Sequence, residues 1–359
     1  MRFEESDQAT AKALELDPAL AESYNIRGIS HYQRQLYDEA LRLFEGYIAA
    51  LPTLEKERIA TGHSNRGNVL SCLNRVQEAI EAYKTAIASA PRSPRTYNTR
   101  IFLSDLYAGQ SQFNEATEAL NGLLALAPNY ADAWYKRGVV RIQMGNPEGA
   151  LEDFKTAVST PRQFSQGLEA SAYQDIQAEW YILEDVIENK SVLSKEPEDG
   201  DAFAMRALAR IYYSKVDNRI AEIEKARKDL EQADSMLKGK TDQEATTFRI
   251  YYASNTIVVF QAGSGEFDKA LKTKRLALRY PPSPEARFGM IFEAIQLVLG
   301  GYQSSTSDAD KKKYIDQCFE FLNLAHELGF KNWQGLAELP AYQPLHSDPR
   351  WAEFLEKIK

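Results

Sequence analysis

A group of small, aromatic and proline residues recurs about every 34 residues along this chain. Pro18 and Pro52 are 34 residues apart, and so are Ala116 and Ala150. A period of this length is typical of a supersecondary unit that is repeated in tandem. One such unit cannot bury its apolar face alone, and therefore the units must stack on one another.

Each copy of the repeat has the side chains that two closely packed helices need. In the first copy, Gly28 and Ala40 are small, whereas Tyr24 and Phe44 are large. Small residues let the helices approach each other, and a large residue four positions later on the same face restores the volume. Pro52 then ends the second helix. Three further copies keep this order, with Gly67, Ala79, Tyr83 and Pro91, then Ser104, Ala116, Leu120 and Pro128, and then Gly138, Ala150 and Phe154.

These residues resemble the tetratricopeptide-repeat (TPR) family, whose unit of about 34 residues follows the pattern W-x2-L-G-x2-Y…A-x3-F…P. The matching copies cover residues 21–52, 60–91, 97–128 and 131–161. The resemblance implies an all-α fold, a right-handed α-solenoid of stacked antiparallel helix pairs. We expect residues 6–18 to be the second helix of a partial repeat, and the chain to be a fragment of a longer protein.

The repeat pattern weakens after Pro161, and this predicts three parts. Residues 1–161 hold regular TPR units, the first one partial, residues 162–282 hold divergent TPR-like helix pairs, and residues 283–359 hold a last helix pair and a C-terminal cap. The final segment, WQGLAELPAYQPLHSDPRWAEFLEKIK, is similar to the endings of bacterial TPR proteins, including TPR regions attached to signalling enzymes. We expect Trp351 to cover the last apolar face, and the similarity favours a bacterial source.

The charge balance argues against nucleic acid as a partner. The net charge is -8, and binding to phosphates needs a surplus of Lys and Arg on one face. The cluster of Lys269, Lys272, Lys274, Arg275 and Arg279 is a local exception, which we interpret as the solvated face of a helix. No run of about 18 apolar residues occurs, so we expect no membrane insertion.

The two cysteines and the start of the chain indicate a cytoplasmic protein. Cys72 and Cys318 lie in apolar helical patterns, which predicts buried free thiols rather than a disulfide. Free thiols suit a reducing compartment. The residues after Met1 contain no apolar segment of the kind found in signal peptides.

Motifs that carry chemistry are missing from the sequence. None of His31, His63, His326 and His346 has a partner residue at the spacing of a metal site. The sequence also lacks the motifs of serine nucleophiles, phosphate-binding loops and dinucleotide sites. We therefore expect no metal, no cofactor and no catalytic residue, and hence no enzyme.

The TPR resemblance places candidate binding residues on the first helix of each pair. In TPR proteins these helices line a concave groove, and set positions on them contact an extended peptide. Carried onto this sequence, the peptide-binding candidates are Asn25, Asn65, Asn68, Asp105, Tyr135, Lys136 and Gln143. Asparagine amides suit a peptide backbone because they donate and accept hydrogen bonds. The alternative, that these are solvated polar positions without a ligand, stays open.

The resemblance also addresses one subtype of partner. TPR proteins that bind the EEVD-type tail of chaperones hold two carboxylates in a clamp of Lys, Asn and Arg side chains. Asn65 fits the middle position of that clamp, whereas Asn25, Ile29, Asn98 and Phe102 occupy others. We therefore expect no binding of a chaperone EEVD-type tail.

Two functions remain as hypotheses. The first is a non-catalytic scaffold that binds a protein or extended peptide in the groove of the TPR solenoid. The alternative is a TPR sensory or regulatory region of a larger bacterial signalling enzyme, such as a kinase or cyclase.

Overall fold

The computed structural model describes residues 2–17, 19–160, 170–237, 244–333 and 339–358. Within these residues the chain forms α-helices, short 3₁₀ helices and turns, and no strand. The predicted all-α helical-repeat fold is therefore confirmed. Pro18 and Pro161, which bound the predicted repeats, lie outside the described residues.

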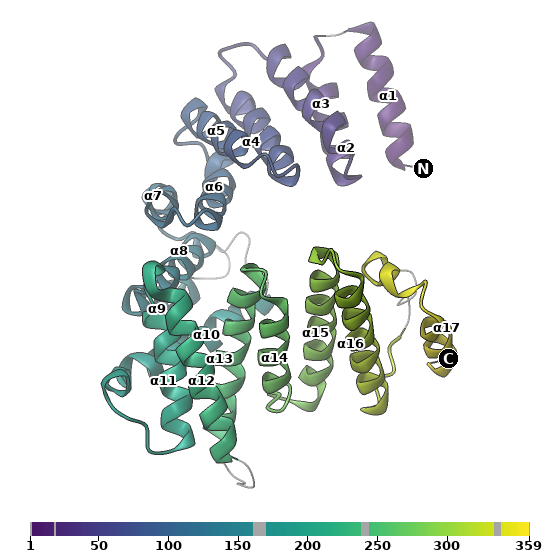
Figure 1. The fold of residues 1–359 in the computed structure, drawn as a ribbon. Helices are drawn as coiled ribbons and strands as arrows, with labels where there is room; N and C mark the ends of the chain where they lie inside the picture. The colour runs from purple at the N-terminus through teal and green to yellow at the C-terminus, as the bar shows by residue number, and fades with distance from the viewer. Residues whose placement is uncertain (1, 18, 161–169, 238–243, 334–338, 359) are drawn as a thin grey trace. The chain divides into compact units, whose positions relative to one another are not determined.

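The chain divides into two compact units, Met1–Leu183 and Glu184–Lys359, which we call the N-terminal and C-terminal units. In the N-terminal unit the helices pair as α2 with α3, α4 with α5, α6 with α7 and α8 with α9 (Figure 1). The helices of this unit are α1 (Arg2–Leu16), α2 (Ala21–Gln33), α3 (Tyr37–Ala50), α4 (Lys56–Cys72), α5 (Val76–Ser89), α6 (Tyr97–Gly109), α7 (Phe113–Leu124), α8 (Ala131–Gln143) and α9 (Pro147–Ser159). A short 3₁₀ helix, η1 (Pro94–Thr96), precedes α6, and α10 (Ala170–Glu188) spans the boundary between the units.

Close contact between the two helices of each pair depends on the predicted small and large residues. A Cβ atom added to Gly28 would lie 2.7 Å from Cε1 of Phe44. The corresponding contacts at Gly138 with Phe154, and at Gly67 with Tyr83, would be closer still. The repeat spacing thus predicts the packing inside each pair correctly.

The turns between paired helices share one backbone feature, a residue with positive φ. Gln35, Asn74 and Ser111 have φ near 60°, and Gly145 has φ 75°. A left-handed residue at this place lets the chain reverse after the first helix. Gly265, between α13 and α14 of the C-terminal unit, also has φ 75°, so the repeat's turn recurs where the sequence pattern is weak.

The C-terminal unit contains three further pairs, α11 with α12, α13 with α14 and α15 with α16 (Figure 1). Its α-helices are α11 (Gly200–Tyr213), α12 (Arg219–Leu237), α13 (Glu244–Gly263), α14 (Phe267–Ala277), α15 (Pro284–Ser304), α16 (Asp308–Glu327) and α17 (Pro349–Lys357). Its 3₁₀ helices are η3 (Lys190–Ser194), η4 (Val216–Asn218) and η6 (Pro340–Leu345). The three parts predicted from the sequence were divided by how regular the repeats are, whereas the two units of the structure are divided by compactness. The three-part division therefore stays a prediction.

Aromatic residues close the end of the C-terminal unit, as expected for Trp351. Trp351 and Phe354 of α17 are buried together with Tyr342 and Leu345 of η6, against residues of α15 and α16. This cluster covers the last apolar face of the stack.

The prediction of two buried thiols is correct for Cys318 and wrong for Cys72. Both are free among the described residues, but Cys72 is exposed because it is the last residue of α4, beyond the packed part of that helix. Its sulfur lies 3.7 Å from the hydroxyl of Tyr32. Burial raises the pKa of the Cys318 thiol to about 12.

Candidate functional site

The first helices α2, α4, α6 and α8 are joined directly by polar side chains. We call the partly exposed side chains along these four helices the first-helix face. Hydrogen bonds and ion pairs connect each helix to the next, from Asn65 to Asn25 (3.3 Å), between Ser64 and Thr99 (2.8 Å), and from Lys136 to Asp105 (3.0 Å). The four helices therefore present one continuous face within the N-terminal unit.

The three asparagine candidates already take part in hydrogen bonds. The Nδ2 group of Asn65 donates to Oδ1 of Asn25, and both side chains are partly exposed. The hydroxyl of Tyr83, on the second helix α5, donates to Oδ1 of Asn68 at 2.7 Å. The Asn68 oxygen thus anchors a core tyrosine, and its NH2 group is the part that can donate to a ligand.

Asp105 and Lys136 form an ion pair, and a second carboxylate lies close to them. Lys136 Nζ is 3.0 Å from both oxygens of Asp105. Asp132, which the sequence candidates omit, lies one turn before Lys136 on α8. Burial raises the pKa of Asp132, Lys136 lowers it, and Asp105 raises it further. The carboxyl groups of Asp105 and Asp132 therefore both interact with the ammonium group of Lys136.

Tyr135 and Gln143 lie on the same helix, α8, but in different environments. The ring of Tyr135 packs against that of Phe154 with centroids 5.7 Å apart, so part of its area belongs to the repeat core. Gln143 is the last residue of α8 and is partly exposed. The candidates are distributed along the first-helix face and do not converge on one point.

Large apolar side chains also lie on this face, at groove positions of the family that were left out of the candidates because these were chosen by polarity. Ile26 and Ile29 of α2 and Phe102 of α6 are 46%, 41% and 40% exposed. Apolar side chains that are grouped on one surface with polar residues around them are typical of surfaces that bind proteins, and Ile26 and Ile29 are neighbours one turn apart on α2. The signal was available in the sequence, since Ile29 and Phe102 occupy positions that the family uses for ligands.

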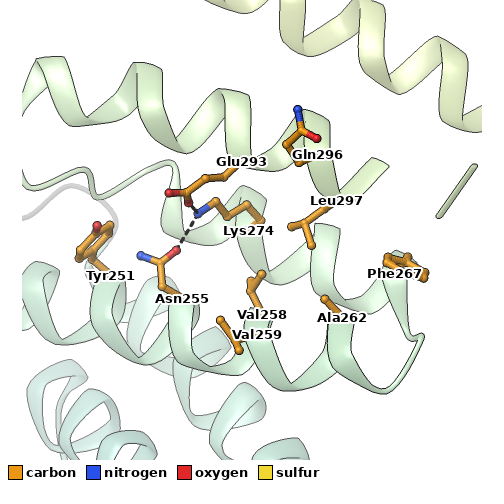
Figure 2. A pocket seen from close by; sticks show the side chains of 10 residues that line it. All are labelled: Tyr251, Asn255, Val258, Val259, Ala262, Phe267, Lys274, Glu293, Gln296 and Leu297. Atoms are coloured by element: carbon orange, nitrogen blue, oxygen red, sulfur yellow. Dashed lines mark hydrogen bonds and ion pairs between the residues drawn. The ribbon is translucent and has the colours of Figure 1, made fainter. Parts of the chain in front are cut away.

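A pocket of about 670 Å³ lies between α13, α14 and α15 of the C-terminal unit (Figure 2). Its lining residues are Tyr251, Asn255, Val258, Val259, Ala262, Phe267, Lys274, Glu293, Gln296 and Leu297. Lys274 is 2% exposed and donates to Oδ1 of Asn255 at 2.8 Å and to a carboxylate oxygen of Glu293. The interpretation of Lys274 as a solvated charge is therefore wrong, because it faces α13 and α15 and not the solvent.

The described residues include no group of three or more His, Cys, Asp or Glu side chains placed to hold a metal ion. Within the same residues, no helix combines the length and the apolar character that crossing a membrane requires.

Residues 103–178 match the family model described as tetratricopeptide repeat. The chain contains tetratricopeptide repeats. The matched segment runs from α6 into α10 and includes the pair α8 and α9, whose TPR spacing is among the clearest in the sequence.

Two curated relatives align with this TPR chain at low identity. Protein FlbA of Caulobacter vibrioides is 24% identical over 188 residues, which are 44% of this chain and 31% of FlbA. A DnaJ homolog subfamily C member 7 homolog of Dictyostelium discoideum is 23% identical over 247 residues, 66% of this chain and 44% of the relative. The chain thus spans less than half the length of either relative.

Two solved TPR structures align with parts of the chain. A crystal structure of MamA has 20% identity and a TM-score of 0.40, and the alignment covers 45% of this chain and 90% of MamA. YrrB, described as a TPR protein with an unusual peptide-binding site, has 22% identity and a TM-score of 0.39, with 49% of this chain and 84% of YrrB covered. Neither score supports an argument about function.

Proposed function

We propose that this chain is a non-catalytic scaffold that binds a protein or an extended peptide on the first-helix face of the N-terminal unit. TPR proteins of this architecture act in general as protein-interaction scaffolds. The observation that carries the proposal is the exposure of Ile26, Ile29 and Phe102 beside polar groups on one continuous row of helices. A few well-packed side chains supply most of the free energy of binding in protein interfaces, and in this proposal Ile26, Ile29 and Phe102 are such side chains.

The polar candidates have separate roles in this proposal. The amide of Asn65, and the NH2 group of Asn68, hydrogen-bond the backbone of the bound segment. Tyr135 adds contact area, and Gln143 extends the surface at the end of α8. Asp105 and Lys136 set the charge preference and the association rate more than the affinity.

The partner's charge follows from the negative balance around Lys136. Asp105 and Asp132 are two carboxylates beside one ammonium group, so a basic residue of the partner would be attracted there. A chaperone EEVD-type tail carries carboxylates and would be repelled. Phe102, at one of the clamp positions, offers an apolar ring instead of a cation.

Nucleic acid is excluded in this proposal because the exposed cations of the basic cluster have acidic partners. These ion pairs are Lys269 with Glu266, Lys272 with Glu231, Arg275 with Glu320 and Arg279 with Asp234. Paired cations leave little net charge for phosphates. We further propose no membrane insertion, and a cytoplasmic location that fits the two free thiols.

The test begins by capturing a partner from cells and identifying it by mass spectrometry. The variant Asn65→Ala with Phe102→Ala should then weaken binding by about 2 kcal/mol or more, roughly 30-fold in Kd, as measured by calorimetry. The control variant Glu81→Ala with Lys84→Ala removes an exposed ion pair of α5, on a second helix, and should leave Kd unchanged. An unchanged Kd in both variants, with unchanged melting, would place the binding site elsewhere.

A further inference from the structure

The pocket of the C-terminal unit is polar at one end and apolar at the other. Figure 2 shows Tyr251, Asn255 and the Lys274–Glu293 pair towards one end, and Ala262 and Phe267 towards the other. Val258, Val259 and Leu297 line the space between. A volume of about 670 Å³ is within the range of pockets that bind small-molecule ligands.

Lys274 can donate one more hydrogen bond into this pocket. An ammonium group has three N–H donors. In the described part of the chain, two of them have acceptors, Oδ1 of Asn255 and a carboxylate oxygen of Glu293. Lys274 lines the pocket although its side chain is 2% exposed, so the third donor can be reached from within the pocket and hardly from elsewhere. An oxygen atom of a ligand in the pocket would complete the coordination.

The ion pair selects a ligand group without net charge. The Glu293 side chain is 67% exposed, so its second oxygen is accessible as an acceptor. A ligand carboxylate would be attracted by Lys274 and repelled by Glu293, and a ligand cation would experience the reverse. A peptide group carries one donor and one acceptor and no charge. It therefore matches a buried ammonium donor beside an accessible carboxylate acceptor.

The apolar wall between the two ends of the pocket leaves a large side chain in contact with water. Val259 of α13 is 71% exposed although it lines the pocket together with Ala262 of the same helix and Leu297 of α15. A ligand side chain such as Leu, Ile or Phe would remove this apolar surface from water, which is favourable in proportion to the area covered.

We propose that this pocket is a second binding site, for an uncharged extended peptide segment with a large apolar side chain. The peptide group next to that side chain pairs with Lys274 and Glu293, and the side chain covers Val259. The site lies within the C-terminal unit and does not depend on the proposed role of the first-helix face.

The test uses the full chain with ¹³C-labelled methyl groups of Ile, Leu and Val, observed by NMR. The probes are three blocked peptides, acetyl-X-Ser-Leu-Ile-Ser-X-amide, in which X is Gln, Glu or Lys. The Gln peptide should shift the methyl signals of Val258, Val259 and Leu297 to saturation. The Glu and Lys peptides should bind ~10-fold more weakly, a difference of about 1.4 kcal/mol. No saturable shift at these methyls, or equal binding of a charged peptide, would overturn the proposal.

A matched pair of surface variants locates the site. Val259→Glu places a charge on the exposed wall of the pocket and should abolish the shifts at Val258 and Leu297. Leu54→Glu makes the same change at a residue that is 89% exposed in the N-terminal unit, and should leave the Gln peptide's Kd unchanged. Binding that survives in both variants would exclude this pocket.

A third variant tests the recognition of charge. Glu293→Gln leaves the charge of the buried Lys274 without its counter-ion but keeps an amide oxygen that can accept its hydrogen bond. Thermal melting of the variant without peptide first shows that the fold is retained. The preference should then invert, and the Glu peptide should bind ~10-fold more tightly than the Gln peptide. If the three peptides keep the order of affinity that they have for the wild type, the ion pair does not select the ligand and the proposal is wrong.

Discussion

Gly138 is the glycine, among those within the described helices, at which an added Cβ atom would make the shortest contact, 2.3 Å to Cε1 of Phe154. A Cβ atom there would overlap the ring of Phe154, whereas Gly109, the last residue of α6, has open space around it. Gly138→Leu should therefore lower the free energy of unfolding by about 1–3 kcal/mol through overpacking. Gly109→Leu should change it by about 0.5 kcal/mol or less. Urea denaturation followed by circular dichroism checks both, and equal stability of the two variants would contradict the repeat register.

The carboxyl group of Asp132 should titrate above the ordinary pKa of aspartate, because burial is the largest cause of its shift. Since the pKa is higher in the folded chain than in the unfolded one, ionisation of Asp132 costs stability as the pH rises through the folded pKa. Lys136 lowers this pKa and Asp105 raises it. NMR titration of the carboxyl carbon should give a higher pKa in Lys136→Met and a lower one in Asp105→Asn. If neither variant changes the pKa of Asp132, its carboxyl group does not interact with Asp105 and Lys136.

At the scale of single side chains, the sequence predicts that the candidates lie on the first helix of each pair, and the structure places them on α2, α4, α6 and α8. The sequence could not show what they contact, and their role in binding stays a prediction. The bond from Tyr83 to Asn68 joins residues 15 positions apart on two helices. Lys274 was interpreted as a surface charge because its neighbours in sequence are basic, although its partner Glu293 lies on a different helix. Contacts of this kind depend on how one helix is rotated against the next, and no local pattern records that rotation.

At the scale of helices, the repeat spacing predicted α2 to α9 well, because small and large residues on the two helices of a pair interlock at fixed positions. Gly28 against Phe44 is one such contact. The spacing is less regular after Pro161, where the sequence predicts divergent helix pairs, and the structure has the pairs α11 with α12, α13 with α14 and α15 with α16. The turn at Gly265, with positive φ, is one local feature of the repeat that persists there.

The turn between α8 and α9 offers a test of how an individual helix begins. Oδ1 of Asn146 accepts a hydrogen bond from the backbone N–H of Gly149 at 3.0 Å, and Pro147 follows at the first helical position. Asn146→Ala should cost about 1 kcal/mol of stability, because the N–H of Gly149 loses its acceptor. Asn146→Ser should recover most of this loss, since serine also caps helices. If both variants unfold at the same denaturant concentration as the wild type, the cap does not stabilise α9.

At the scale of the whole molecule, we propose one binding surface for each compact unit. The first-helix face is built from residues of the N-terminal unit, and the pocket at Lys274 is built from residues of the C-terminal unit. A substitution on one surface should therefore not change the free energy of binding at the other surface, and the effects of two such substitutions should add. The Phe102→Ala substitution, for example, should leave the Gln peptide's methyl shifts at Val259 unchanged.

Site-specific photo-crosslinking can show whether the first-helix face contacts a partner protein. The photoreactive residue p-benzoylphenylalanine would replace Ile26 or Phe102 on the first-helix face, or Lys84 on the second helix α5. All three positions are exposed, so the fold should tolerate the substitution. The account predicts that, on illumination in cells, positions 26 and 102 crosslink to the same protein and position 84 does not. A crosslink from position 84 alone, or from none of the three, would contradict it.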